Sequence, residues 1–247
     1  MGRRSWVEQV MGLPVSVLAR GVTAGSAAAD DAVHAVYAEL REVDRVFSPY
    51  RDDSEVSRLG RGELAWSEAT PLVREVATRC LRAAELTGGL FDATRPDGTW
   101  DPSGLVKGWA TERAARLLSA VGDLDWCLNA GGDVVVSCPS GEPFVVGIQD
   151  PLDPAGLSTS VRCLSGAVAT SGTAARGAHL YDPRTGRPTA SDWLSVSVIG
   201  PSLETADVLA TAAFVAGSLE VVEHTDRYHG LAVAADSSLL TTEGWPR

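Results

Sequence analysis

The chain has 247 residues, and 21 lysines and arginines against 32 aspartates and glutamates give it a formal net charge of −11. This acidic balance disfavours both a sequence-independent grip on nucleic acid and electrostatic docking on an anionic membrane, because each needs a field of cations. A hydrophobic share of 45% is typical of a globular protein and excludes wholesale disorder. If an anionic ligand binds, its counter-charge must come locally, from a metal ion, a helix N-terminus or a few placed cations.

Nothing in the sequence predicts export or membrane insertion. Pro14 and Arg20 interrupt the apolar stretch that follows the N-terminal arginines, so we expect no cleaved signal peptide. No window approaches the roughly 18 apolar residues that a transmembrane helix needs. The cysteines lack CxxC spacing, and we expect small buried side chains in a reducing cytoplasm. They are Cys80, Cys127, Cys138 and Cys163.

Hydrophobic periodicity predicts a strand and three helices in the first half of the chain. Alternating apolar residues predict a strand over residues 13–20. Apolar residues at three- and four-residue steps predict an amphipathic helix over 30–47. The next helix begins at Thr70, where Pro71 fits the first turn, and ends at the glycine pair 88–89. A third helix is expected from near Gly104 to Val121.

The second half begins with short strands and returns to helices. Strands are expected over 126–129, 134–138, 144–148, 158–164, 167–170 and 194–200. Helices follow over 204–216 and 219–228, before a closing strand over 231–235. No repeat or low-complexity linker divides the chain, so we expect one domain over 1–247, with room for two intertwined subdomains. This order indicates an α+β fold with a mixed, largely antiparallel β core flanked by helices.

Asp207 and Thr211 form a pair with the spacing of a cation site. They stand four residues apart on a predicted helix and so project from one face, one turn apart. A carboxylate and a hydroxyl in this arrangement can share a hard cation such as Mg²⁺, which prefers oxygen ligands. The alternative is a solvated Asp beside a Thr that bonds back to its own helix.

Three glycine-containing segments offer further places for a ligand. In GGLFDAT, at residues 88–94, two glycines allow a ligand to approach the backbone closely, and the aromatic residue and the acid that follow could hold a flat ring. The alternative is that this segment is only a helix C-cap and turn. DPSGLVKGWA, at 101–110, puts a helix start and Lys107 where a phosphate could bind, or it is an ordinary capped helix. NAGGD, at 129–133, forms either a nest of N–H groups or a tight hairpin turn.

His179 stands three residues before Asp182 in a loop rich in proline and glycine. A histidine with an acidic neighbour could serve as a general base. A histidine in a turn can equally be a plain surface residue. The spacing alone leaves both interpretations open.

Taken in order, these segments resemble the ApbE family, the FAD:protein FMN transferases. The resemblance covers about Met11 to Gly217. It implies a Mg²⁺-dependent enzyme that transfers the FMN half of FAD to a Thr or Ser hydroxyl of a target protein and releases AMP. The expected partners are FAD and that acceptor protein. The eight collinear motifs are FSPYRDDSEVSRL, GGLFDAT, DPSGLVKGWATERAARLL, NAGGD, VGIQDP, AVATSG, HLYDPRTGRP and ETADVLATAAFVAG.

The resemblance also implies roles for individual residues. Asp207 and Thr211 would hold a single Mg²⁺, joined by the backbone carbonyl of Gly104. His179, with Asp182 in the same motif, would activate the acceptor hydroxyl. Many relatives carry an N-terminal lipobox cysteine that is absent here, so we expect a cytoplasmic enzyme. The implied flavin-nucleotide contacts are Met11, Tyr50, Leu90, Phe91, Asp92, Asp101, Lys107, Thr170 and Tyr181.

Other functions would use the same residues. In a Mg²⁺-dependent FAD pyrophosphatase, water would replace the protein hydroxyl and free FMN and AMP would result. A non-catalytic FAD-binding protein would release no AMP. A structural interaction module would show no rise in melting temperature with FAD, whereas a true ligand site would. The sequence alone does not separate the transferase from the pyrophosphatase.

Overall fold

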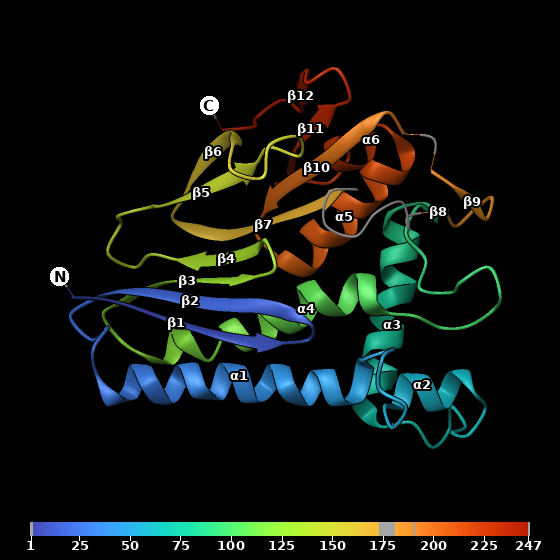
Figure 1. The fold of residues 1–247 in the computed structure, drawn as a ribbon, viewed down its shortest axis with the longest axis horizontal. Coiled ribbons are helices and arrows are strands. Elements are labelled where there is room, and N and C mark those ends of the chain that lie inside the picture. The colour runs from blue at the N-terminus through green and yellow to red at the C-terminus, as the bar shows by residue number, and fades with distance from the viewer. Residues whose placement is uncertain (1, 173–180, 190, 247) are drawn as a thin grey trace.

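The computed structural model describes residues 2–172, 181–189 and 191–246. Within these residues an eight-stranded sheet runs through the molecule, and all of its neighbouring strands are antiparallel (Figure 1). Two small hairpins, β5–β6 (Phe144–Gln149 and Leu157–Cys163) and β8–β9 (Tyr181–Asp182 and Arg187–Pro188), lie outside it. In spatial order the sheet strands are β1 (Gly2–Val10), β2 (Leu13–Gly21), β3 (Leu124–Ala130), β4 (Asp133–Ser137), β7 (Ser165–Gly172), β10 (Trp193–Gly200), β11 (His229–Ala234) and β12 (Leu239–Thr241).

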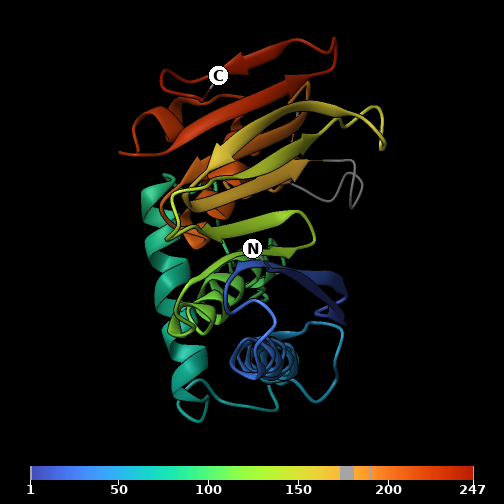
Figure 2. The same ribbon diagram turned by 90° about the vertical axis from the view of Figure 1, so that its left-hand side faces the viewer.

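The helices gather on one side of this sheet. Helix α4 packs against both α1 and α5, and α5 also contacts β7 and β10. In the view turned by 90°, α1 is seen end-on beneath the sheet and α3 stands along its side (Figure 2). The helices are α1 (Ala27–Phe47), α2 (Glu55–Gly60), α3 (Pro71–Leu86), α4 (Ser103–Ala115), α5 (Leu203–Ala216) and α6 (Glu220–Glu223).

Alternation along the central strands divides the buried residues between two cores. Val135 and Ala169 face the helices, whereas their neighbours Val134 and Val168 face the β5–β6 hairpin. The helix-side core is the larger. This architecture confirms the predicted α+β class with a largely antiparallel β core flanked by helices. No helix in the described ranges is long and apolar enough to cross a membrane.

Two expected helices are shorter than predicted. The third one ends as an α-helix at Ala115, and a short 3₁₀ helix, Leu118–Ala120, follows. Leu118 is still fully buried. The apolar spacing in the sequence therefore continues beyond the residue at which the α-helical hydrogen bonds end. The helix expected over 219–228 is only α6, and Arg227 has the left-handed φ of 68°.

Five elements were not predicted at all: strands β1 and β12, helix α2 and the two short strands of the β8–β9 hairpin. Strands β1 and β12 are the two edges of the sheet, and their mostly exposed side chains carry no clear apolar alternation. Helix α2 has only six residues and contributes the single buried side chain of Val56. It begins at Ser54, whose hydroxyl accepts the Ser57 N–H at 3.1 Å.

Two tight turns join neighbouring strands of the sheet. Met11 and Gly12, with φ of 57° and 69°, join β1 to β2. Gly131 and Gly132, with φ of 61° and 104°, join β3 to β4. Both turns need left-handed backbone, which glycine adopts without strain. The NAGGD segment is therefore a hairpin turn, and it sets Asp133 as the first residue of β4.

Candidate functional site

A cleft of about 1210 Å³ opens on the helix side of the molecule. Its wall comes from the β1–β2 turn, the end of α1, the loop after α3, the start of α4, strand β8 and helix α5. Pockets of roughly 300–1,000 Å³ hold drug-sized ligands, so this one has room for a dinucleotide. Ten of the predicted site residues line it: Met11, Tyr50, Leu90, Phe91, Asp92, Asp101, Gly104, Lys107, Tyr181 and Thr211.

One wall of the cleft is apolar and aromatic. The glycine pair after α3 has positive φ and ends that helix, as Gly89 N–H donates to the Ala84 carbonyl at 2.8 Å. The turn directs Phe91 inward, where its ring would lie 3.2 Å from a Cβ on Gly104. Tyr181 enters from β8, and burial raises the pKa of its phenol. This wall suits a flat ring that packs against aromatic surface.

Asp101 shapes the rim where α4 begins. Its Oδ1 accepts the Ser103 N–H at 3.1 Å, and its Oδ2 pairs with the Arg95 guanidinium. Asp92 closes a similar local turn by accepting the Thr94 N–H at 2.7 Å. A carboxylate therefore already lies against the first amide of α4, where the sequence suggested a phosphate could bind.

Lys107 lines the cleft, and beneath it the Lys107 ammonium lies between two buried carboxylates, Asp133 and Asp207; we call these three residues the charged floor. Lys107 Nζ lies 2.7 Å from Asp133 Oδ2 and 3.6 Å from Asp207 Oδ1. Asp133 and Asp207 are 1% and 2% exposed. In so dry a setting charge–charge interactions are much stronger than in water. Asp133 was not among the predicted site residues, although the NAGGD segment pointed to its position.

Helix α5 brings Thr211 to the same place, one turn after Asp207. The Thr211 hydroxyl lies 3.0 Å from the Ser171 hydroxyl of β7. Ser171 was not predicted. Thr170, which was predicted, directs its hydroxyl to Ser197 at 2.8 Å on the opposite face of the sheet, and only its backbone N–H reaches Asp133, at 3.2 Å.

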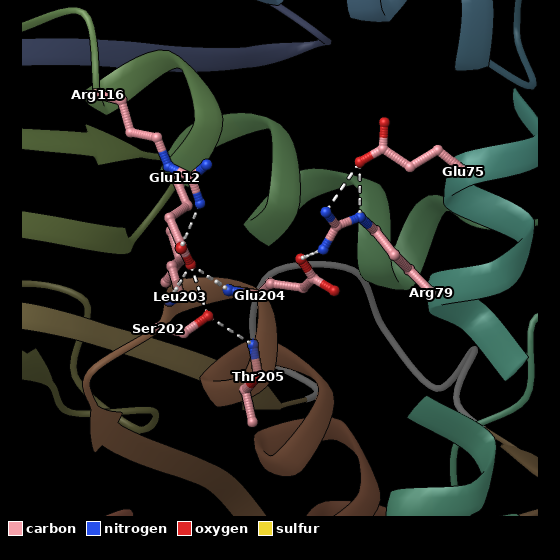
Figure 3. A network of polar contacts seen from close by, with 8 residues as sticks. All are labelled: Glu75, Arg79, Glu112, Arg116, Ser202, Leu203, Glu204 and Thr205. Atoms are coloured by element: carbon pink, nitrogen blue, oxygen red, sulfur yellow. Dashed lines mark hydrogen bonds and ion pairs between the residues drawn. The ribbon is translucent and has the colours of Figure 1, made fainter. Parts of the chain in front are cut away.

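A network at the start of α5 fixes that helix against α4 (Figure 3). Glu112 of α4 accepts from the Ser202 hydroxyl at 2.6 Å and from the N–H groups of Leu203 and Glu204 at 2.8 and 3.2 Å. A carboxylate at this end of a helix satisfies free amides and the helix dipole. From α3, Arg79 pairs with Glu204 at 2.8 Å. Burial raises the pKa of Glu204 despite this partner.

Gly108 allows the two helices to approach closely. A Cβ at this position would lie 2.9 Å from the Leu203 carbonyl and 3.0 Å from the Asp207 Cβ. Only glycine therefore fits at the crossing of α4 and α5. The same crossing sets the separation of Lys107 from Asp207.

The oxygen donors here suit a hard cation. Among the residues that the structure describes, no cluster of three or more His, Cys, Asp or Glu side chains could hold a metal unaided. Asp207 and Thr211 provide a carboxylate and a hydroxyl beside an open cleft. Mg²⁺ commonly takes one or two carboxylates and completes its shell with water and ligand phosphates, so this donor set fits it.

The predicted catalytic pair is only half described. His179 lies outside the described residues. Asp182 lines a second cavity, of about 500 Å³, that shares Val215 with the cleft. Its carboxylate accepts from Arg184 Nε at 3.0 Å and Nη2 at 2.9 Å, and these bonds hold the pKa of Asp182 below its usual range. The structure thus separates Asp182 from the residues of the charged floor.

Comparisons with known proteins agree on one family. The model of the ApbE family matches residues 11–97 and 93–234. The FAD:protein FMN transferase of Escherichia coli K12 is 32% identical over 160 residues, which are 60% of this chain and 44% of that protein. The enzyme of the same name from Rhodobacter capsulatus is 36% identical over 142 residues, 53% of this chain and 27% of that protein. The chain thus spans less than half the length of these curated relatives.

Solved structures share the fold over nearly the whole chain. The ApbE protein of Thermotoga maritima has a TM-score of 0.85 at 23% identity, covering 98% of this chain and 97% of its own. The flavin transferase ApbE of Vibrio cholerae has a TM-score of 0.77 at 24% identity, with the same coverage. At such identities the likeness concerns the fold. With the family model matched over most of its length, this chain belongs to the ApbE family.

Proposed function

We propose that this protein transfers the FMN half of FAD to a Thr or Ser hydroxyl of an acceptor protein, in a reaction that needs Mg²⁺ and releases AMP. The names of the curated relatives support this proposal. The observation that carries it is the cleft itself. An aromatic wall suited to a flavin ring and Lys107, the cationic residue of the charged floor, line one cavity of about 1210 Å³.

The proposed roles follow the chemistry of each wall. Leu90, Phe91 and Tyr181, which line the aromatic wall, pack against the flavin ring. Lys107 lines the cleft and carries the positive charge that a diphosphate needs. Asp207 and Thr211, joined by the backbone carbonyl of Gly104, would hold one Mg²⁺.

In the proposed reaction the acceptor hydroxyl oxygen attacks the phosphorus of the FMN half. The new P–O bond forms as the bond to the bridging oxygen breaks, and that oxygen leaves with AMP. Lys107 stabilises the negative charge that gathers on the phosphate oxygens. A bound divalent cation would neutralise part of the same charge. His179 takes up the hydroxyl proton or orients the hydroxyl, with Asp182 three residues further along the chain.

The decisive test supplies FAD, Mg²⁺ and a candidate acceptor, and then denatures the mixture. We expect flavin fluorescence to stay with the acceptor band, an added FMN mass on one Thr or Ser, and AMP in equal amount. Free FMN with AMP and no labelled protein would instead indicate the pyrophosphatase. Tight FAD binding without AMP would indicate a binding protein.

A further inference from the structure

The Lys107 ammonium is held asymmetrically within the charged floor. It lies 2.7 Å from Asp133 and 3.6 Å from Asp207. Asp133 is the closer partner, and its second carboxylate oxygen accepts the Thr170 N–H of β7 at 3.2 Å. The sheet therefore determines where the end of a flexible lysine side chain rests.

Asp133 is itself placed with little freedom. It is the first residue of β4, its backbone pairs with Ala130 of β3, and it follows the two left-handed glycines of the turn. Gly132 N–H donates to the Asn129 side-chain oxygen at 2.8 Å, which closes that turn. At 1% exposure the carboxylate has no room to swing away from Lys107.

Asp133 also contributes to the formal charge of the charged floor. Two carboxylates and one ammonium give the charged floor a net charge of −1. Without Asp133 the sum is zero, and the nearest remaining carboxylate for the ammonium is Asp207. Lys107 would then draw closer to the residue on which a divalent cation depends. Both changes oppose cation binding, and both act over a few ångströms in a dry interior.

We infer that Asp133 is a positioning residue that anchors the Lys107 ammonium on the sheet side and so limits how closely that ammonium approaches Asp207, the carboxylate on which a divalent cation depends. This inference rests on the cation site of the proposed function. Groups that orient metal ligands or their neighbours from behind commonly change metal affinity by roughly 10- to 100-fold when they are removed.

Charge-matched variants test this inference without any catalytic readout. Mn²⁺ is titrated into the FAD-free protein and free Mn²⁺ is read by electron paramagnetic resonance, with Asp207→Asn as the blank for the site. Asp133→Asn, with a floor charge of zero, should bind Mn²⁺ at least about tenfold more weakly. Lys107→Met, with a charge of −2, should bind it more tightly. The double variant, again at −1, should return close to the wild-type affinity.

Asp125→Asn is the matched control. Asp125 is also a buried carboxylate paired with a cationic side chain on a sheet strand, since Arg20 Nε lies 3.0 Å away, but Arg20, unlike Lys107, does not line the cleft. Its loss should leave Mn²⁺ affinity unchanged. If Asp133→Asn binds as the wild type does, or the double variant binds more weakly than Asp133→Asn, the inference is wrong. Should Lys107→Met fail to fold, the double variant still decides.

The same titration separates a failure of the cation site from a failure of the role given to Asp133. A wild-type chain that takes up no more Mn²⁺ than Asp207→Asn overturns the proposed cation site and this inference together. Normal Mn²⁺ binding that does not respond to Asp133→Asn overturns the inference alone.

Discussion

Two buried carboxylates of this protein each lie beside a cation but belong to different places. Asp207 belongs to the charged floor, with Lys107 at 3.6 Å. Asp125 ties β3 to the loop before β5: it pairs with Arg20 at 3.0 Å and accepts from the Ser140 hydroxyl at 2.6 Å. Asp207 lies under the open cleft, whereas Asp125 lies where the sheet packs against the loop before β5. Substituting each should therefore separate function from stability.

Asp207→Asn should reduce flavin transfer on the order of a thousandfold, because several kcal/mol of charge stabilisation depend on the cation. Its melting temperature should change little, since Lys107 keeps Asp133 as its closer partner. Asp125→Asn should show the reverse, losing about 3 kcal/mol of stability while kcat is kept. Steady-state transfer and thermal melts of both variants are the measurements. Wild-type turnover in Asp207→Asn would contradict the assignment.

Acid should weaken the scaffold through Asp125. Burial alone would raise the pKa of this carboxyl, but hydrogen bonds from Ser140 and the Arg20 guanidinium outweigh burial and hold it below its usual range. The unfolded state therefore binds a proton more readily than the folded state. The contribution of Asp125 to the free energy of unfolding is fully present above about pH 4, and it is lost as pH falls through the folded-state pKa of Asp125. Urea unfolding from pH 6 to pH 3 should show the gap between wild type and Asp125→Asn shrinking, and a constant gap would refute this explanation.

Site prediction from the sequence was limited by side-chain direction. Thr170 and Ser171 are neighbours in one motif, yet strand alternation sends only Ser171 to the helix side, where it meets Thr211. A motif does not reveal which residue of an alternating pair faces the cleft. Asp133 was missed as a site residue for a related reason: its partner Lys107 is distant in the chain and joins it only through the packing of α4 on β4.

Helices α4 and α5 form the scaffold of the charged floor. Gly108 permits their close approach, and Glu112 caps α5 from α4. The residues that carry the site were predicted to lie on helices, and both helices were found. Their contact was not predictable, because a glycine inside a helix signals neither a partner nor a crossing. The edge strands β1 and β12 were not predicted. A strand is recognised in a sequence by alternating apolar residues, which arise when one face of the strand is buried, and most side chains of these two edge strands are exposed.

Gly108→Ala should force α4 and α5 apart. The new methyl group would lie 2.9 Å from the Leu203 carbonyl and about as close to Asp207, so we expect a loss of about 1–3 kcal/mol and lower turnover. The control is Gly60→Ala in α2, where nothing lies within 4 Å of the added atom. That change should alter stability by less than about 1 kcal/mol. Equal effects of the two substitutions in urea unfolding and transfer assays would argue against the close crossing.

On the scale of the whole molecule, one sheet separates two cores, and a cysteine packs in or against each of them. Cys80 of α3 belongs to the helix-side core, and Cys127 of β3 packs against the hairpin-side core. All four cysteines are free thiols. Because both cores share the sheet, we propose that the chain unfolds as a single domain.

Thiol reactivity should follow this architecture. Burial raises the pKa of both Cys80 and Cys127 to about 12, so almost no thiolate exists at pH 8. A chromogenic disulfide reagent should leave both unmodified in the folded protein and modify both, in one step, across the unfolding transition. Mass spectrometry of trapped samples identifies the sites. Prompt labelling of Cys80 in the native state would contradict the packing of α3.

We propose above all that the charged floor binds the diphosphate of FAD through a cation held on α5. The most direct measurement is a crystal structure of the protein with FAD and Mn²⁺, in which anomalous scattering locates the ion. We predict one strong peak within bonding distance of the Asp207 carboxylate and the Thr211 hydroxyl, with the flavin ring against Phe91. A peak elsewhere, or FAD bound outside the cleft, would contradict the account.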